Sequence, residues 1–275
     1  MGLEAFAAVA VYDRFTFLAH HTTMILWKER LTASGIHLGI SASIAVLAAF
    51  LVFALWYPYP YREISGGREL FLLVVTVDVF MGPLITLAIF DRAKPRTELR
   101  RDLTVVALLQ LGALGYGLWT VAVARPVHLV FEIDRFRVVH AIDIPEALLP
   151  LVPPQIEAKP WTGPTPLAVR TFRSENERTE ATIAALGGVQ LGARPDLWEP
   201  YAAARSRVLA TAKPVSQLKR RFPDRGAQID SALRSGRRDE AHALWLPLVG
   251  RKNFWTAFID PATAEVVAFL PLDSF

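Results

Sequence analysis

Residues 70–90 read LFLLVVTVDVFMGPLITLAIF, an apolar run with a single charged side chain, Asp78. At about 1.5 Å of rise per residue, a helix of this length crosses a hydrocarbon core of about 30 Å. Two further runs of similar length are Ile36–Trp56 and Leu103–Ala124, whereas residues 125–275 are too polar and proline-rich to insert. The sequence therefore predicts a membrane protein in which three transmembrane α-helices precede an α+β domain.

This pattern divides the chain into an N-terminal segment at 1–35, a membrane domain at 36–124 and a second domain at 125–275. The short loop 91–102 carries five Lys or Arg, whereas the two arginines of loop 57–69 are offset by two glutamates. Short basic loops stay in the cytoplasm. We therefore expect a cytoplasmic N-terminus and a C-terminal domain on the far side, which in a bacterium is the periplasm.

The first 23 residues fit this plan poorly. Their apolar stretch is too short to span a membrane, and it lacks the order of charges of a signal peptide. Met24 stands just before the first apolar run. We expect either that translation begins at Met24 or that residues 1–23 form a loose cytoplasmic tail.

Composition and motifs argue against catalysis. The net charge of +4 is spread along the chain, and the absence of cysteine excludes catalytic thiols and thiolate metal sites. The sequence lacks the motifs of serine hydrolases, zinc proteases, phosphate-binding loops and dinucleotide-binding folds. His128 and His140 flank an expected hairpin and are interpreted as structural, and Asp239, Glu240 and His242 as a solvated face. We therefore predict no catalytic residues, no metal and no cofactor.

Asp78 is the most informative residue of the membrane part, because a carboxylate at this depth must face other helices. Counted from the same side, Tyr116 of the third run lies at nearly its depth, Gln110 lies nearer Thr86, and His37 is too far away to pair with it. Two interpretations remain open: a hydrogen bond that fixes the packing of the three helices, or a docking point for another protein's span. Proton transport is disfavoured, since no second buried acid or base continues a path.

Small residues mark two packing positions. Gly82 and Pro83 follow Asp78 by one turn, and Pro83 should kink the helix. The third run carries a patch of small residues that permits close approach of helices, either within this chain or with a foreign helix. The patch consists of Gly112, Ala113, Gly115 and Gly117.

The C-terminal domain mixes strand and helix signals. We expect a hairpin or two short strands at 127–133 and 136–140, a hairpin at 254–260 with 265–270, and an extended loop or a linker, not a helix, at 145–166. We expect a capped helix at 174–186 and further helices at 196–212, 214–222 and 224–235. Trp161, Gly163 and Pro164 place an aromatic ring on a rigid turn. Such a ring can anchor a partner, or it can pack on its own domain.

The chain also resembles the type IV pilin accessory proteins, the TfpX/TfpZ group with the fimbrial assembly relative FimB. The segments that carry the resemblance are Gly35–Ser41, Trp56–Pro58, Gly66–Gly67, Val77–Thr86, Lys94–Arg96, Leu99–Leu103, Gln110, Arg125–Pro126, Phe131–Val138 and Pro160–Pro164. The resemblance is dense to about Ile144. It implies an inner-membrane, non-enzymatic protein that assists a cognate major pilin, aiding its stability or its assembly into pili.

Three functional hypotheses follow. The first is a chaperone-like accessory factor whose partners are the transmembrane helix and periplasmic head of a pilin, together with the lipid bilayer. The second is a membrane-anchored enzyme that modifies pilin or envelope glycans, which would need clustered acids or a nucleophile with its base. The third is a generic periplasmic sensor module. The missing catalytic motifs favour the first.

Overall fold

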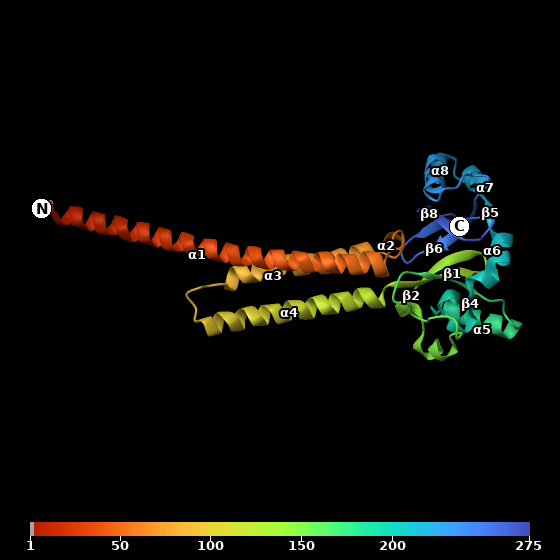
Figure 1. Ribbon diagram of the computed structural model, residues 1–275, viewed down its shortest axis with the longest axis horizontal. Helices are drawn as coiled ribbons and strands as arrows, with labels where there is room; N and C mark the ends of the chain where they lie inside the picture. Colours follow the sequence, from red (N-terminus) through yellow and green to blue (C-terminus); the bar gives the residue numbers. More distant parts are fainter. Residues whose placement is uncertain (1–2) are drawn as a thin grey trace. The chain divides into compact units, whose positions relative to one another are not determined.

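The computed structural model describes residues 3–275, with side chains from Trp27 onward, and it divides into two compact units (Figure 1). One, here the membrane unit, comprises the chain up to Ala49 together with Phe71–Trp119. The other, here the sheet unit, comprises Phe50–Leu70 and Thr120–Phe275. Each unit is described by itself.

Three helices of the described chain are long and apolar enough to cross a membrane, which confirms the predicted class. They are α1 (Leu3–Phe50, continued by a π-helical turn at Leu51–Trp56), α3 (Gly67–Ile89) and α4 (Arg96–Val123). The candidate spans within them are Trp27–Trp56, Gly67–Ile89 and Arg96–Val123. The helices exceed the apolar runs because polar residues at their ends continue the helical hydrogen bonds.

The start of α4 illustrates this extension. The Pro95 carbonyl accepts from the Leu99 N–H, with N and O 3.1 Å apart, and Glu98 lies in the first turn, where a negative charge stabilises a helix N-terminus. The helix therefore begins seven residues before Leu103. At the other end of the sequence, α1 is helical from Leu3, where a loose tail was one of two expectations. The side chains of residues 1–26, which include Met24, lie outside the described part. That translation begins at Met24 stays a prediction.

The sheet unit is built on one mixed sheet, with strand order β4-β3-β1-β2-β6-β7-β8 and β5 paired to β6 within this fully described unit. β1 runs antiparallel to β2 and parallel to β3, and β2 runs parallel to β6. The strands are β1 (Pro126–Glu132), β2 (Arg135–His140), β3 (Thr165–Val169), β4 (Trp198–Pro200), β5 (Lys213–Pro214), β6 (Leu244–Val249), β7 (Phe254–Ile259) and β8 (Val266–Leu270).

Both faces of this sheet are covered, so its central strand reads as one apolar run: every residue of β1 is buried. Leu129 and Phe131 face a core shared with Ile64, whereas Val127 and Val130 face a core shared with Ala181 of α5. A third core packs the last two helices on β6 to β8. The helices are α2 (Tyr61–Ile64), α5 (Glu175–Leu186), α6 (Arg205–Thr211), α7 (Val215–Arg221) and α8 (Gly226–Ser235).

Most predicted elements of this unit are confirmed. Ser174 caps α5 by accepting from the Glu177 N–H at 3.2 Å, and both predicted hairpins form. The helix expected at 196–212 is wrong in its first half. Only Arg205–Thr211 is α-helical, because Pro195 and Pro200 divide the preceding residues into 3-10 turns and the short strand β4. The sequence analysis missed β3, β4, β5 and β6.

The segment between the first two spans belongs to the sheet unit. Ile64 of α2 is fully buried in the core, and its carbonyl accepts from the Arg251 N–H at 3.3 Å. Gly66 follows with φ +69°, a conformation that favours glycine. The sequence indicated only a loop here; the structure makes it a structural part of the sheet unit.

Candidate functional site

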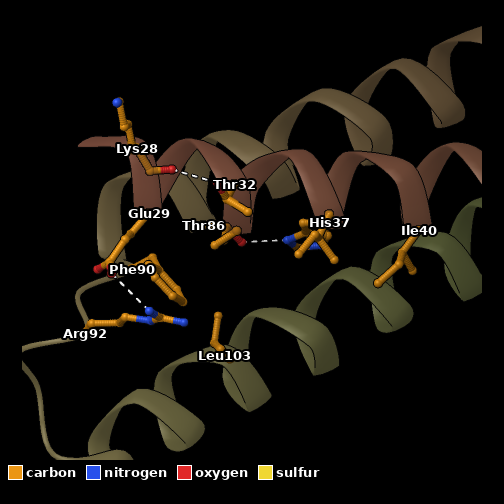
Figure 2. A pocket seen from close by; sticks show the side chains of 11 residues that line it. Lys28, Glu29, Thr32, His37, Ile40, Thr86, Phe90, Arg92 and Leu103 are labelled. Atoms are coloured by element: carbon orange, nitrogen blue, oxygen red, sulfur yellow. Dashed lines mark hydrogen bonds and ion pairs between the residues drawn. The ribbon is translucent and has the colours of Figure 1, made fainter. Parts of the chain in front are cut away.

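A cavity of about 550 Å³ opens between α1, α3 and the start of α4 in the membrane unit (Figure 2). A second cavity of about 240 Å³ continues it, with His37 and Ile40 lining both. We call the two together the groove. Its apolar walls are Ala33, Ile36, Ile40 and Ile44 of α1 and Leu103, Ala107, Leu111 and Leu114 of α4, and its polar residues in the membrane interior are Thr32, His37, Ser41, Asp78, Thr86 and Gln110.

The helical repeat explains how one sequence places these residues together. On α1, Thr32, Ile36, Ile40 and Ile44 recur every four residues, and such residues share one face of an α-helix. On α4, Leu103, Ala107 and Leu111 follow the same spacing. The groove therefore lies between one face of α1 and one face of α4, and α3 supplies further lining residues.

Two hydrogen bonds join α1 to α3 beside the groove. His37 Nδ1 and Thr86 Oγ1 lie 2.6 Å apart (Figure 2). Ser34 Oγ donates to the Pro83 carbonyl at 2.9 Å. Both pairs satisfy polar groups within the apolar span, where water is absent. They fix the register of α1 against α3.

Asp78 lies deeper in the groove and is only half satisfied. The Gln110 amide donates to the Asp78 backbone carbonyl at 3.1 Å and not to the Asp78 carboxylate. Asp78 Oδ1 is buried and accepts no hydrogen bond from any described side chain or backbone group. An Asp at the centre of a span costs at least about 2.5 kcal/mol on insertion scales. Within the described chain, Oδ1 gains no hydrogen bond that would offset this cost.

The expected depth match of Asp78 with Tyr116 is therefore corrected. Gly117 packs against Val74, one turn before Asp78, and Gln110 reaches Asp78 itself. Tyr116 is 70% exposed, and its ring lies 5.8 Å from that of Trp119. The depth count from the ends of the apolar runs placed Tyr116 opposite Asp78, where the structure places Gln110.

His37 lines the same cavity as Asp78 but bonds Thr86, so the expectation that it does not pair with Asp78 stays a prediction. Gln110 was placed near the level of Thr86, whereas a Cβ added to Gly82 would overlap the Gln110 amide. The structure thus brings His37, Asp78, Gly82 and Gln110 together.

The small residues fall into two groups. Gly82, Pro83 and Gly117 are buried between the helices of this chain. Ala113 and Gly112 are exposed on the surface of α4, and a Cβ at Gly112 or Gly115 would meet nothing within 4 Å. The predicted patch is therefore half internal packing and half open surface.

Ion pairs mark the end of the groove near the basic loop. Arg92 lies 3.0 Å from Glu29 across the mouth of the cavity (Figure 2). Lys94 lies 2.9 Å from Asp102. These pairs are exposed or half-exposed, so each contributes little to stability. Their charge is typical of helix ends at a membrane surface.

Trp161 packs within the sheet unit, on the end of the first span. Its ring meets the Trp56 ring edge-on at 5.4 Å and lies 5.4 Å from the Arg125 guanidinium carbon. The Gly163 N–H donates to the Leu55 carbonyl at 2.6 Å. These residues (Leu55, Trp56, Arg125, Trp161 and Gly163) form what we call the clasp. Pro164, the next residue, lines a separate cavity of the sheet unit.

Arg125 anchors the clasp. Its guanidinium donates to the carbonyls of Ala122 at 2.7 Å, Lys159 at 3.2 Å and Pro160 at 3.2 Å, although burial lowers its pKa from the ordinary value. One side chain therefore joins the end of α4 to the proline-rich loop. The packing interpretation of Trp161 gains support, although more than half of its surface stays exposed.

The cavity that Pro164 lines has a volume of about 480 Å³ and lies among aromatic rings of the sheet unit. Tyr201 donates to the Ala264 carbonyl at 2.5 Å beside it, and burial raises the pKa of this tyrosine to about 12. The charged side chains at this cavity are Arg205 and Glu265. They present no nucleophile with a base.

The histidines of the sheet unit bond to neighbouring groups of that unit. His128 is fully buried, lies 2.7 Å from Thr165 Oγ1 and 3.0 Å from the Ala158 carbonyl, and burial lowers its pKa to about 4. His140 bonds Asp143 at 2.9 Å, and His242 bonds Asp239 on an exposed surface at 2.7 Å. The described residues hold no group of three metal-ligating side chains.

The chain is similar to known proteins along most of its length. A family model described as fimbrial assembly protein FimB matches residues 25–66. The fimbrial assembly protein of serogroup I from Dichelobacter nodosus is 33% identical over 244 residues, covering 88% of this chain and 95% of that protein. The serogroup E1 protein of the same species matches equally, with 33% identity over the same extent.

The chain belongs to the FimB-like family of fimbrial assembly proteins. A third relative, of serogroups C1 and C2, is 40% identical over 111 residues, 40% of this chain. No solved structure matches. Because the long matches cover 88% of the chain, the membership applies to the membrane unit and the sheet unit together. The family is named for assembly and not for a catalytic activity.

Proposed function

We propose that this protein is a non-enzymatic accessory factor of the bacterial inner membrane that assists a cognate type IV major pilin. It aids the stability of the pilin or its assembly into pili. The observation that carries the proposal is the 33% identity over 244 residues to proteins named for fimbrial assembly, because it extends through both units of the chain.

The architecture supports this role. A pilin waiting for assembly offers a membrane helix and a head outside the membrane. This chain has three candidate spans and a sheet unit, so it has a surface for each part. The basic loop 91–102 supports a cytoplasmic N-terminus and a periplasmic position for residues 125–275.

The chemistry of the sheet unit supports a binding role over catalysis. His128 is held neutral in the core, and the exposed pair of His242 and Asp239 has no nucleophile beside it in the described structure. Replacing His128, His140, Asp239 or Glu240 by alanine should leave pilin levels near normal wherever the protein still accumulates. Lost pili at normal abundance of any such variant would favour an enzyme that modifies pilin or glycans.

Deletion and restoration of the gene in its own host test the proposal. We expect deletion to lower the amount of the cognate pilin or of surface pili, as measured by immunoblot and electron microscopy, while unrelated membrane proteins stay unchanged. The wild-type gene supplied in trans should restore both. Unchanged pilin and unchanged pili in the deletion strain would refute the role.

A further inference from the structure

We propose that the groove between α1 and α4 receives one transmembrane helix of the pilin, and that this helix presents a hydrogen-bond donor to Asp78. This inference rests on the proposed function and adds the surface and the chemistry of recognition. The steps below concern the membrane unit alone.

The first step is the unsatisfied carboxylate. Asp78 Oδ1 is buried against the groove and accepts no hydrogen bond from the described chain, since Gln110 is used by the backbone carbonyl. Lipid tails fill open grooves in a membrane, but hydrocarbon donates no hydrogen bond. The occupant that fits must therefore bring a polar donor to the interior of the span, which a protein helix can do.

The second step is the size and shape of the groove. It runs from Lys28 to Ile44 along α1, which at about 1.5 Å per residue is roughly 24 Å. Its two walls are single helix faces lined by Ile and Leu side chains, with the small residues Ala33, Ser41 and Ala107 between them. A long apolar groove with one polar contact fits an apolar helix with one donor.

The third step is the open surface next to Thr32. Gly35, Gly39 and Ser43 follow Thr32 at intervals of three and four residues, so they continue one stripe along α1. A Cβ added at Gly35 or Gly39 would meet nothing within 4 Å. Gly-x-x-x-Gly stripes allow another helix to approach closely. Within the described chain this stripe is uncovered, so a docked helix could use it.

Two substitutions separate docking from folding. Asp78→Leu leaves every described hydrogen bond of the membrane unit in place, because Gln110 contacts the backbone. Gly39→Leu adds a side chain in open space and removes a poor helix former. Neither should lower the abundance of the chain. Gly112→Leu is the matched control: neither glycine lines the groove and both are open, but Gly112 lies on α4, outside the stripe of Gly35, Gly39 and Ser43.

The test is photocrosslinking in cells that make the cognate pilin. A benzophenone amino acid replaces Ile40 in the groove or, as a control, Leu72, an exposed residue of α3 that does not line it. We expect a pilin adduct from position 40 and not from 72. Asp78→Leu should reduce its yield about 3- to 30-fold, the range that one intramembrane hydrogen bond represents. Gly39→Leu should also reduce the yield, by blocking close approach, and Gly112→Leu should not.

Each other outcome overturns the inference. Adducts only with lipid or with a second copy of this chain would assign the groove to those occupants. If the Asp78→Leu variant forms the pilin adduct in undiminished yield, the Asp78 carboxylate does not recognise the pilin helix. If pilin copurifies with the chain but forms no adduct from position 40, the proposed function stands and the groove is refuted. Unchanged amounts of pilin and of pili in the deletion strain would refute both the proposed function and the groove.

Discussion

At the scale of single residues, burial decides which groups can titrate. His128 has a pKa of about 4 in the folded chain and 6.5 as the ordinary value. Between these pH values the unfolded state binds a proton that the folded state excludes. The contribution of neutral His128 to the free energy of unfolding should therefore be fully present above pH 6.5. It should decrease as the pH drops toward 4, by up to roughly 3 kcal/mol.

Urea unfolding of the detergent-solubilised chain, followed by tryptophan fluorescence between pH 4 and 7, measures this effect. Trp198 is a local reporter, because its ring lies 4.8 Å from that of His128. His128→Gln should flatten the loss of stability in this window, whereas His242→Gln, on the exposed surface, should not. An equal slope in His128→Gln and the wild type would contradict the assignment.

Glycines of α4 give a second residue-scale prediction. A Cβ at Gly117 would lie 2.5 Å from a methyl carbon of Val74, a stiff β-branched side chain, whereas one at Gly115 would meet nothing within 4 Å. Gly117→Ala should cost about 1–3 kcal/mol of stability through overpacking. Gly115→Ala should be neutral or slightly stabilising. Thermal unfolding of the two purified variants compares them; equal midpoints would show that the α3–α4 packing is looser than described.

At the scale of elements, the clasp joins the ends of two spans to the proline-rich loop. Arg125→Lys cannot reproduce the fork that serves three carbonyls, so we expect a loss of about 1–3 kcal/mol. Arg220→Lys, on an exposed position of α7, should change little. The measurement is urea unfolding of the full chain. If Arg125→Lys unfolds at the same urea concentration as the wild type, the clasp contributes no stability.

Elements with a local signal were predictable, and elements defined by distant partners were not. The apolar runs, the Ser174 cap and the two antiparallel hairpins depend on neighbours in sequence. By contrast, β6 pairs in parallel with β2 across more than a hundred residues, and α2 is held by Ile64 in a distant core. Periodicity does not carry such information.

The same distinction explains the candidate site. A charged residue within an apolar run identified Asp78, whereas Gln110 was placed near the level of Thr86 and not beside Asp78. The partner assignment to Tyr116 was wrong, because the structure places Gln110 opposite Asp78. His37 was not predicted to line the groove, because the face of α1 that packs on α3 depends on contacts distant in sequence, such as the bond of His37 to Thr86.

At the scale of the whole molecule, orientation is testable because the chain contains no cysteine. Single substitutions Ala93→Cys in the basic loop and Ala241→Cys in the sheet unit both place a thiol at an exposed position. A membrane-impermeant maleimide, applied to cells with a permeabilised outer membrane, should label the second variant and spare the first. Labelling of the first, or protection of the second until the inner membrane is lysed, would reverse the proposed topology.

The protein is proposed to act by binding a pilin. The most direct measurement is affinity purification of the full, detergent-solubilised chain from its own cells, followed by quantitative mass spectrometry of what remains bound. We predict that the cognate pilin is enriched over unrelated inner-membrane proteins of similar abundance. Absence of the pilin from the purified complex, with pili lost in the deletion strain, would contradict stable binding and point to an indirect or catalytic role.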